Sequence, residues 1–365
     1  PVIFMNYGGQ MRWRMRSGEV LDADLGTMLT KDLTAHAWRT ALSPTGEWIP
    51  AVLRAADQRL TQVRRAIPDA GGLVIATNQT VARAYAKILA EITGKRPAVI
   101  LSDDAKAGGR IEEFAASQDR WMVAVRMVSE GVDVPRLAVG VYATSTSTPL
   151  FFAQAVGRFV RSRRRGEVAT VFLPTVPILL AHAATLERQR DHVLGRPRSE
   201  ETDIWAETEA LIDAANRDEK ASDDLLGEFE ALDSQATFDH VLFESQAFGM
   251  HAEPTSQDEL DYLGLPGLLE PEQVSTLLAE RQRRQLRRRE RKDPKSQPEV
   301  PLHRALANQR KELNSLVAQL ARLEQRPHSH VHADLRRECG GPPLAQATTE
   351  QVAERISRAR AWLRR

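Results

Sequence analysis

Three polar side chains near the middle of the chain have the spacing to bind a nucleotide phosphate. Gln154, Arg158 and Arg161 are separated by four and three residues, so a helix over Phe151 to Arg161 places them on one face. Two guanidinium groups on one face can neutralise the charge that develops on a γ-phosphate during its transfer. Gly157 lies between them and allows close backbone approach. The alternative interpretation is an amphipathic helix whose arginines are solvated.

Further polar segments follow predicted strands. Thr77, Asn78 and Gln79 come after a strand over 73–76, Ser102 after a strand over 98–101, and Ser129, Gly131 and Asp133 after a strand over 121–125. Hydroxyl and amide side chains suit contacts to a phosphate backbone that do not read sequence. Gly131 permits a tight turn, and Asp133 offers a carboxylate to a ribose hydroxyl. The structural alternatives are an N-cap for the helix from Val81 and a turn capped by Asp133.

The elements that position these residues alternate between strand and helix. Helical spacing over 47–67 precedes the strand at 73–76, and helices over 81–92, 110–116 and 151–161 separate strands at 98–101, 121–125, 138–143 and 168–173. This alternation predicts an α/β fold for residues 1–195, with a parallel sheet and helices on both faces. Ligands bind such sheets at the carboxyl ends of the strands.

In this order, segments 73–79, 125–135 and 154–161 resemble motifs IV, V and VI of the second RecA-like domain of a superfamily 2 DEAD/DEAH-type helicase. The resemblance covers residues 70–175. It implies that Arg158 and Arg161 are arginine fingers and that Gln154, Gly157, Gly131 and Asp133 contact ATP. It also implies that Thr77, Asn78, Gln79, Ser102 and Ser129 contact nucleic acid. Ala155 stands where many DEAD-box proteins have arginine, which favours DNA over RNA as the partner.

Two features of an ATP-hydrolysing domain are missing from the sequence. It contains no G-x-x-x-x-G-K-[ST] loop and no apolar strand ending in Asp-Glu. We therefore expect ATP and Mg²⁺ to be bound mainly by a first RecA-like domain preceding Pro1, and this chain alone to be inactive. The sequence thus predicts the C-terminal half of an ATP-dependent helicase or translocase. The alternatives are a non-catalytic module that binds nucleic acid or protein, and an RNA helicase.

Charge divides the rest of the chain. Residues 200–261 hold 19 Asp and Glu against two basic residues, whereas residues 281–365 hold 21 Lys and Arg against nine acids. We predict an acidic helical linker over 196–271 and a basic α-helical module over 272–365. Arg284 and Arg288 lie in a predicted helix whose positive charge is dense enough to bind nucleic-acid phosphates, and we predict that both contact nucleic acid. The alternatives are pairing with the acidic block and a protein partner for the C-terminal helices.

Composition limits the remaining possibilities. The 365 residues carry a formal net charge of +1 and one cysteine, Cys339, which excludes a disulfide framework and fits a cytoplasmic protein. No run of 18 apolar residues and no signal-peptide pattern occurs, so no membrane partner is expected. His328, His330 and His332 with Cys339 do not match structural zinc spacings, so no metal site is predicted.

Overall fold

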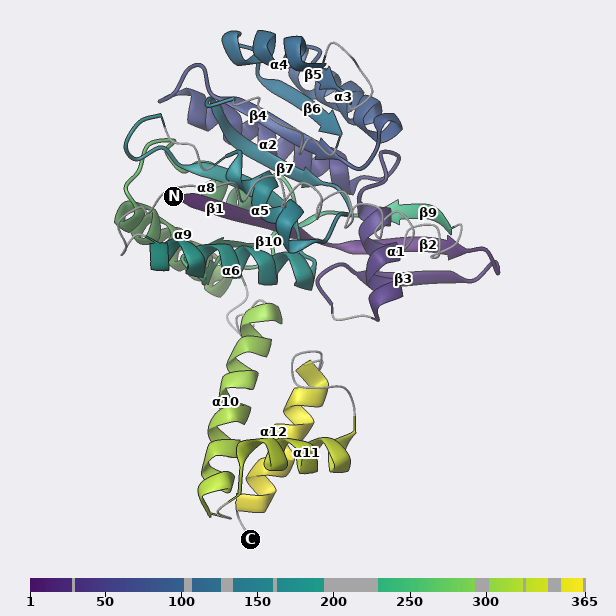
Figure 1. The fold of residues 1–365 in the computed structure, drawn as a ribbon, viewed down its shortest axis with the longest axis vertical. Coiled ribbons are helices and arrows are strands. Elements are labelled where there is room, and N and C mark those ends of the chain that lie inside the picture. Colours follow the sequence, from purple (N-terminus) through teal and green to yellow (C-terminus); the bar gives the residue numbers. More distant parts are fainter. Residues whose placement is uncertain are drawn as a thin grey trace, which may run out of the picture. The chain divides into compact units, whose positions relative to one another are not determined.

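The computed structural model describes residues 1–27, 30–101, 107–125, 134–159, 163–193, 229–292, 302–323, 326–340 and 349–363. The chain divides into two compact units, Pro1–Pro298 and Glu299–Arg365. Figure 1 shows the ribbon of both.

An eight-stranded sheet forms the centre of the first unit in the described part of the chain, in the order β11-β10-β1-β8-β7-β4-β6-β5. The strands are β1 (Val2–Gly8), β4 (Gly71–Ala76), β5 (Ala98–Ile100), β6 (Trp121–Val125), β7 (Leu137–Ala143), β8 (Ala169–Pro174), β10 (Thr237–Phe243) and β11 (Gln246–Phe248). Strands β1, β8, β7, β4, β6 and β5 run parallel, whereas β10 and β11 add an antiparallel edge. The central strands are buried apolar runs, as expected where helices cover both faces.

Helices cover both faces of this sheet, which confirms the predicted α/β class. They are α2 (Trp48–Arg64), α3 (Gln79–Thr93), α4 (Ala107–Ala116), α5 (Pro149–Gly157), α6 (Pro177–Val193), α8 (Gln257–Leu263) and α9 (Pro271–Lys292). Side chains three apart on β1 point to opposite faces. Phe4 stacks on Phe152 of α5, and Tyr7 donates a hydrogen bond of 2.6 Å to Glu259 of α8.

A smaller three-stranded sheet extends from the first unit (Figure 1). It comprises β2 (Gln10–Met15), β3 (Val20–Asp24) and β9 (Phe229–Ser234), and α1 (Lys31–Ala41) packs against it. Gly9, with φ of +129°, allows the chain to pass from β1 into β2. A Cβ atom there would lie 1.8 Å from the Gln235 carbonyl oxygen, so only glycine fits.

The predicted acidic helical linker over 196–271 is wrong in its described part. Residues 229–248 form β9, β10 and β11, and helix is confined to α8 and the first residue of α9. The reason lies in segment 237–243, TFDHVLF, whose β-branched and aromatic residues suit a strand. It pairs along β1, so the region completes the main sheet. Residues 196–228 lie outside the described residues.

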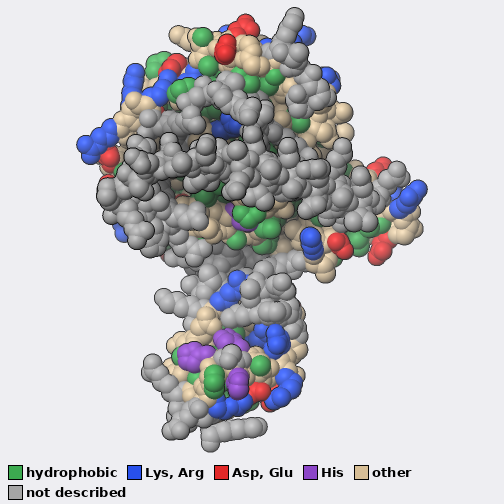
Figure 2. Space-filling view, in the orientation of Figure 1, with side chains coloured by type: hydrophobic (Ala, Val, Ile, Leu, Met, Phe, Trp, Pro, Cys, Tyr) green, Lys and Arg blue, Asp and Glu red, His purple; other side chains and the backbone are tan. Residues whose placement is uncertain are grey.

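Three helices make up the described part of the second unit: α10 (Leu302–Leu323), α11 (His328–Cys339) and α12 (Thr349–Leu363). Their shared core includes Leu313, Val317, Leu335, Val352 and Ile356. Basic and histidine side chains gather on the face shown in Figure 2. The basic helical module predicted over 272–365 is helical in all its described segments, but α9 belongs to the first unit.

Candidate nucleotide and nucleic-acid site

The chain reverses its direction of winding between β4 and β7, which neighbour each other in the sheet. From β4 the chain continues through α3 to β5 on one side, whereas from β7 it continues through α5 to β8 on the other. In open α/β sheets, the carboxyl ends of strands at such a switch point form the ligand crevice. The topology therefore places the candidate crevice between the ends of β4 and β7.

Residues of predicted motif IV lie at this crevice. Ala76 pairs with Ala143 across the two strands, so Thr77 directly follows β4 beside the end of β7. The Asn78 side chain accepts a hydrogen bond of 2.9 Å from the Val81 backbone N–H and caps α3. The N-cap alternative is thus confirmed for Asn78. Thr77 is half-buried and Gln79 begins α3, so both side chains lie at the predicted edge.

Sequence reasoning missed a group of hydroxyl residues on the other side of the crevice. Thr144 and Thr146, which follow β7, are buried, and their hydroxyl oxygens lie 3.1 Å apart. The Tyr142 hydroxyl donates to the Thr146 carbonyl at 2.7 Å, and a His182 ring nitrogen lies 2.8 Å from the Ser147 carbonyl. These contacts hold the loop in a defined shape. The run TSTST over 144–148 directly after a predicted strand was the available signal.

A further buried hydroxyl stands at the same edge, after β8. Thr175 is 4% exposed, and its backbone N–H donates to the Tyr7 carbonyl at 2.9 Å. Its hydroxyl oxygen has no hydrogen-bond partner among the described residues. Asp24 lies near it, because a Cβ on Gly26 would meet both side chains. Burial raises the pKa of Asp24, and the Gly26 N–H and His251 partly oppose this. The carboxyl edge thus carries polar groups from β4 to β1.

Helix α5 carries the residues of predicted motif VI that the structure describes. It ends at Gly157 with Arg158 as its C-cap, so the helix predicted to reach Arg161 is shorter than expected. The reason is packing, because the Phe159 ring turns under β7 and occupies the space that a Cβ on Gly140 would need. Arg161 lies outside the described residues.

Gln154 and Arg158 still lie one helical turn apart, as their spacing predicts. Both side chains are half-buried. Among the described residues, the buried Gln154 amide oxygen has no hydrogen-bond partner, whereas Arg158 has an interaction with another residue. Buried acceptors are rarely left unsatisfied, so Gln154 offers an acceptor to a group from outside the described chain. Gly157 is exposed with open space over its Cα, which leaves room for such an approach.

The structure does not bring Arg158 to the crevice between β4 and β7. Helix α5 begins at the carboxyl edge and runs back along the sheet. Phe159, just after the helix, lines a pocket at the amino edge together with Leu137 and Ala169, the first residues of β7 and β8. The predicted phosphate-contacting edge and the predicted arginine-finger helix are therefore two separate surfaces. Ser102, Ser129, Gly131 and Asp133 lie outside the described residues.

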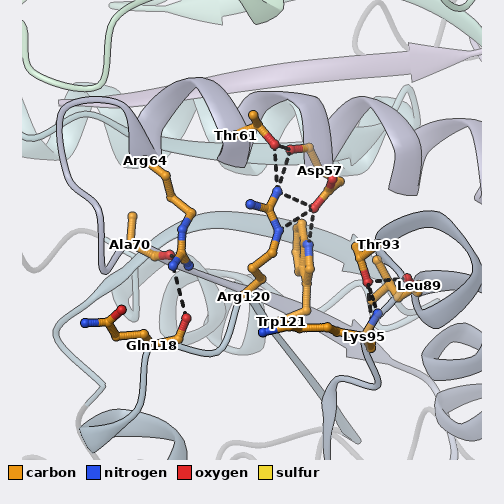
Figure 3. Close-up of polar contacts among 10 residues, drawn as sticks. All are labelled: Asp57, Thr61, Arg64, Ala70, Leu89, Thr93, Lys95, Gln118, Arg120 and Trp121. Atoms are coloured by element: carbon orange, nitrogen blue, oxygen red, sulfur yellow. Dashed lines mark hydrogen bonds and ion pairs between the residues drawn. The ribbon is translucent and has the colours of Figure 1, made fainter.

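A dense polar network occupies the amino edge of the sheet (Figure 3). One Asp57 carboxylate oxygen accepts from Arg120 Nη2 at 2.7 Å and from the Trp121 indole N–H at 2.8 Å. Arg120 also donates to the Thr61 hydroxyl at 2.7 Å. Because these residues come from α2 and from the start of β6, the network joins the helix to the sheet. Its donors and acceptors satisfy one another, so its role is structural.

Predicted phosphate contacts on α9 are engaged within the protein. Arg288 forms ion pairs with Asp258 at 3.1 Å and Asp261 at 2.7 Å. Arg284 pairs with Glu280 at 3.2 Å. Pairing with the acidic block is therefore confirmed for Arg288, because the acidic α8 packs beside α9. Among the described residues, Arg284 meets only Glu280 of its own helix at the surface, so the phosphate contact predicted for Arg284 stays a prediction.

No group of three or more metal-ligating side chains occurs among the described residues, which include His328, His330, His332 and Cys339. The three histidines lie on α11. Burial, with charge from His328 and Arg355, lowers the pKa of His332. Within the same described ranges, no helix is long and apolar enough to cross a membrane.

Three mycobacterial proteins are similar to almost the whole chain, and no family model matches it. The uncharacterized protein ML1624 of Mycobacterium leprae is 49% identical over 99% of this chain and 61% of its own length. The uncharacterized proteins MT2985 and Rv2917 of Mycobacterium tuberculosis are 51% and 50% identical over 98% of this chain. The chain thus spans about 60% of the length of these relatives.

Solved structures with partial similarity are helicase domains. The structure titled "Mss116p DEAD-box helicase domain 2 bound to an RNA duplex" is 13% identical, with a TM-score of 0.30 over 46% of this chain and 65% of that one. The Hef helicase domain of Pyrococcus furiosus is 18% identical, with a TM-score of 0.26 over 37% of this chain and 28% of that one. Because both TM-scores are low, the fold class rests on the sheet topology described above.

Proposed function

We propose that this chain is the part of an ATP-dependent nucleic-acid helicase or translocase that completes a nucleotide site and contacts the nucleic-acid backbone. Arg158 and Arg161 supply positive charge to the γ-phosphate, and Gln154, Gly157, Gly131 and Asp133 contact the nucleotide. ATP and Mg²⁺ are held mainly by a separate RecA-like domain of the same protein, because this chain lacks a phosphate loop. Closure of the two domains over ATP then couples hydrolysis to movement along a strand.

The observation that carries this proposal is the arrangement of Gln154 and Arg158 on α5. A short helix packed through Phe151 and Phe152 presents an unpartnered amide acceptor one turn from a guanidinium group. Beside them, Gly157 leaves open space. A nucleotide held by another domain fits such a surface, because it needs both a polar contact and charge neutralisation of its terminal phosphate.

The second surface supports the nucleic-acid part of the proposal. Thr77, Gln79 and the loop 144–148 bring hydroxyl and amide groups to the switch-point edge. Ser102 and Ser129 belong to the proposal as predicted contacts to the same backbone. Such groups suit phosphate contacts. Ala155, in place of the arginine found in many DEAD-box proteins, favours DNA over RNA. The helices of the second unit offer a surface for a protein partner.

The test uses the protein that contains this chain together with its nucleotide-binding domain. Arg158→Ala and Arg161→Ala are each expected to lower ATP turnover by at least 10³-fold, with nucleotide binding largely retained. Arg165→Ala is the matched control, since this arginine is 90% exposed. Retained turnover in both finger variants contradicts the proposal. ATP-independent nucleic-acid or protein binding, with no turnover in the unmodified protein, favours the non-catalytic binding module instead.

A further inference from the structure

Helix α9 carries the densest positive charge of the chain. Residues 281–292 include eight basic residues and one acid, Glu290. The structure separates them into two groups, because one side of the helix is packed against the first unit and the other side is exposed.

The packed side is held firmly. The buried Gln285 side chain accepts from the Met250 N–H at 3.0 Å and donates to the Met250 carbonyl at 2.9 Å. Arg288 is bound by two aspartates of α8, and Arg289 donates to the His251 carbonyl. These contacts fix the rotation of α9 about its own axis.

The opposite side presents Arg283, Arg287 and Arg291, which we call the arginine stripe. All three are exposed, and none has an ion pair or hydrogen bond within the described chain. Spacings of four residues place successive charges about 6 Å apart along one helix face. Glu280 and Glu290 are exposed too, but Glu280 is paired with Arg284, so the three arginines leave the stripe positive.

The end of α9 lies at the same edge of the sheet as the candidate crevice. Arg289 contacts His251, the neighbouring Ala252 bridges to Phe238, and Phe238 pairs with Tyr7 near the carboxyl end of β1. Strand β4, which Thr77 follows, is three positions from β1 in the sheet. Three strand spacings separate β1 from β4 by about 14 Å along this edge.

The chemistry of this side matches phosphate better than a protein or membrane surface. The exposed large hydrophobic residues of the described chain are Val20, Ile178, Leu232 and Leu260, and none belongs to α9. Protein interfaces depend on buried apolar or aromatic anchors, and interfacial membrane helices need an exposed apolar face. Guanidinium groups in a row instead provide charge-assisted, bidentate contacts to phosphate oxygens.

We propose that Arg283, Arg287 and Arg291 bind successive phosphates of a nucleic-acid strand and extend the carboxyl-edge track beyond the RecA-like sheet. This inference rests on the proposed function, since it supplies a contact for the same strand. It replaces Arg288, which is engaged by α8, with the arginines on the opposite side of the helix.

The experiment measures binding of labelled 20-nucleotide oligo(dT) and oligo(U) to the 365-residue chain over a salt series. Substitution of all three stripe arginines by Gln is expected to lower the slope of log K against log salt by about 2, since each single-strand phosphate contact contributes about 0.7. The affinity at low salt falls at least tenfold. Comparison of the two oligonucleotides identifies the preferred strand chemistry.

A charge-matched control is available at the amino edge. Arg65, Lys95 and Arg96 are exposed, and the triple Gln variant of these residues is expected to keep the wild-type slope. Both triple variants should keep the wild-type Tm, because none of these side chains has a hydrogen bond or ion pair within the described residues.

An unchanged slope in the stripe variant overturns the inference, as does an equal fall in the control or no binding by the unmodified chain. None of these results changes the outcome of the ATP-turnover test on Arg158. The two proposals can therefore fail separately.

Discussion

Asp57 offers a stringent test of how the fold is held together. One of its oxygens accepts from Arg120 Nε at 3.1 Å, from Arg120 Nη2 at 2.7 Å and from the Trp121 indole nitrogen at 2.8 Å (Figure 3). The Asp57 and Arg120 side chains are 17% and 26% exposed, so solvent screens the pair only in part. Asp57→Ala leaves the Trp121 N–H without its acceptor and the Arg120 guanidinium without its counter-charge.

The expected cost follows from these contacts. A hydrogen bond to a charged group contributes about 1.5–3 kcal/mol, and an orphaned buried donor costs about 1–3 kcal/mol. Arg120 keeps its bond to Thr61, so the contributions do not add fully. We expect Asp57→Ala to lower the free energy of unfolding by about 3 kcal/mol and Tm by about 5 °C.

Urea unfolding and calorimetry of the full chain measure this loss. Asp22→Ala is the control, because its ion pair with Arg12 is 59–70% exposed and surface pairs contribute about 1 kcal/mol or less. Nucleic-acid binding by folded Asp57→Ala protein should be unchanged, since the network lies at the amino edge. A loss below about 1 kcal/mol, or lost binding at full stability, would refute the reasoning.

Three further predictions concern strain, an orphaned hydroxyl and a buried acid. Glu244 and Ser245 turn the chain between β10 and β11 with φ of 48° and 58°. Because glycine adopts positive φ without steric cost, Ser245→Gly should raise the free energy of unfolding by about 0.5–1 kcal/mol in urea titrations. A destabilised variant would contradict this. Thr175→Val should stabilise the chain by about 1 kcal/mol, because it removes a buried hydroxyl without a partner; destabilisation would reveal a hydrogen bond. Burial raises the pKa of Glu259 despite the hydrogen bond from Tyr7. Folding therefore favours the acid form of Glu259, and its contribution to stability falls as the pH rises from its ordinary pKa through its raised pKa. Glu259→Gln should flatten that part of the stability profile between pH 4 and 8, and an unaltered profile would exclude Glu259 as its source.

Much of the α/β core was predictable because its signals are local. The strand predicted at 121–125 coincides with β6, and the helix predicted over 81–92 lies within α3, Gln79–Thr93. Apolar runs identify strands that are buried on both faces, and N-cap and glycine signals bound the helices. The spacing of Gln154 and Arg158 also needed only the helical period.

The tertiary structure alone decided which residues are free to act. Residues 229–248 form strands because β10 pairs with β1 and β9 pairs with β2, more than 200 positions earlier in the chain. The sequence analysis had predicted helices for this acidic region. Arg288 and Arg287 are neighbours of the same type, yet only the first meets Asp261, because the rotation of α9 is set by buried contacts such as that of Gln285. Local sequence therefore determined the elements of the α/β core, whereas packing between distant segments determined the strands at 229–248 and which charged side chains remain available to a ligand.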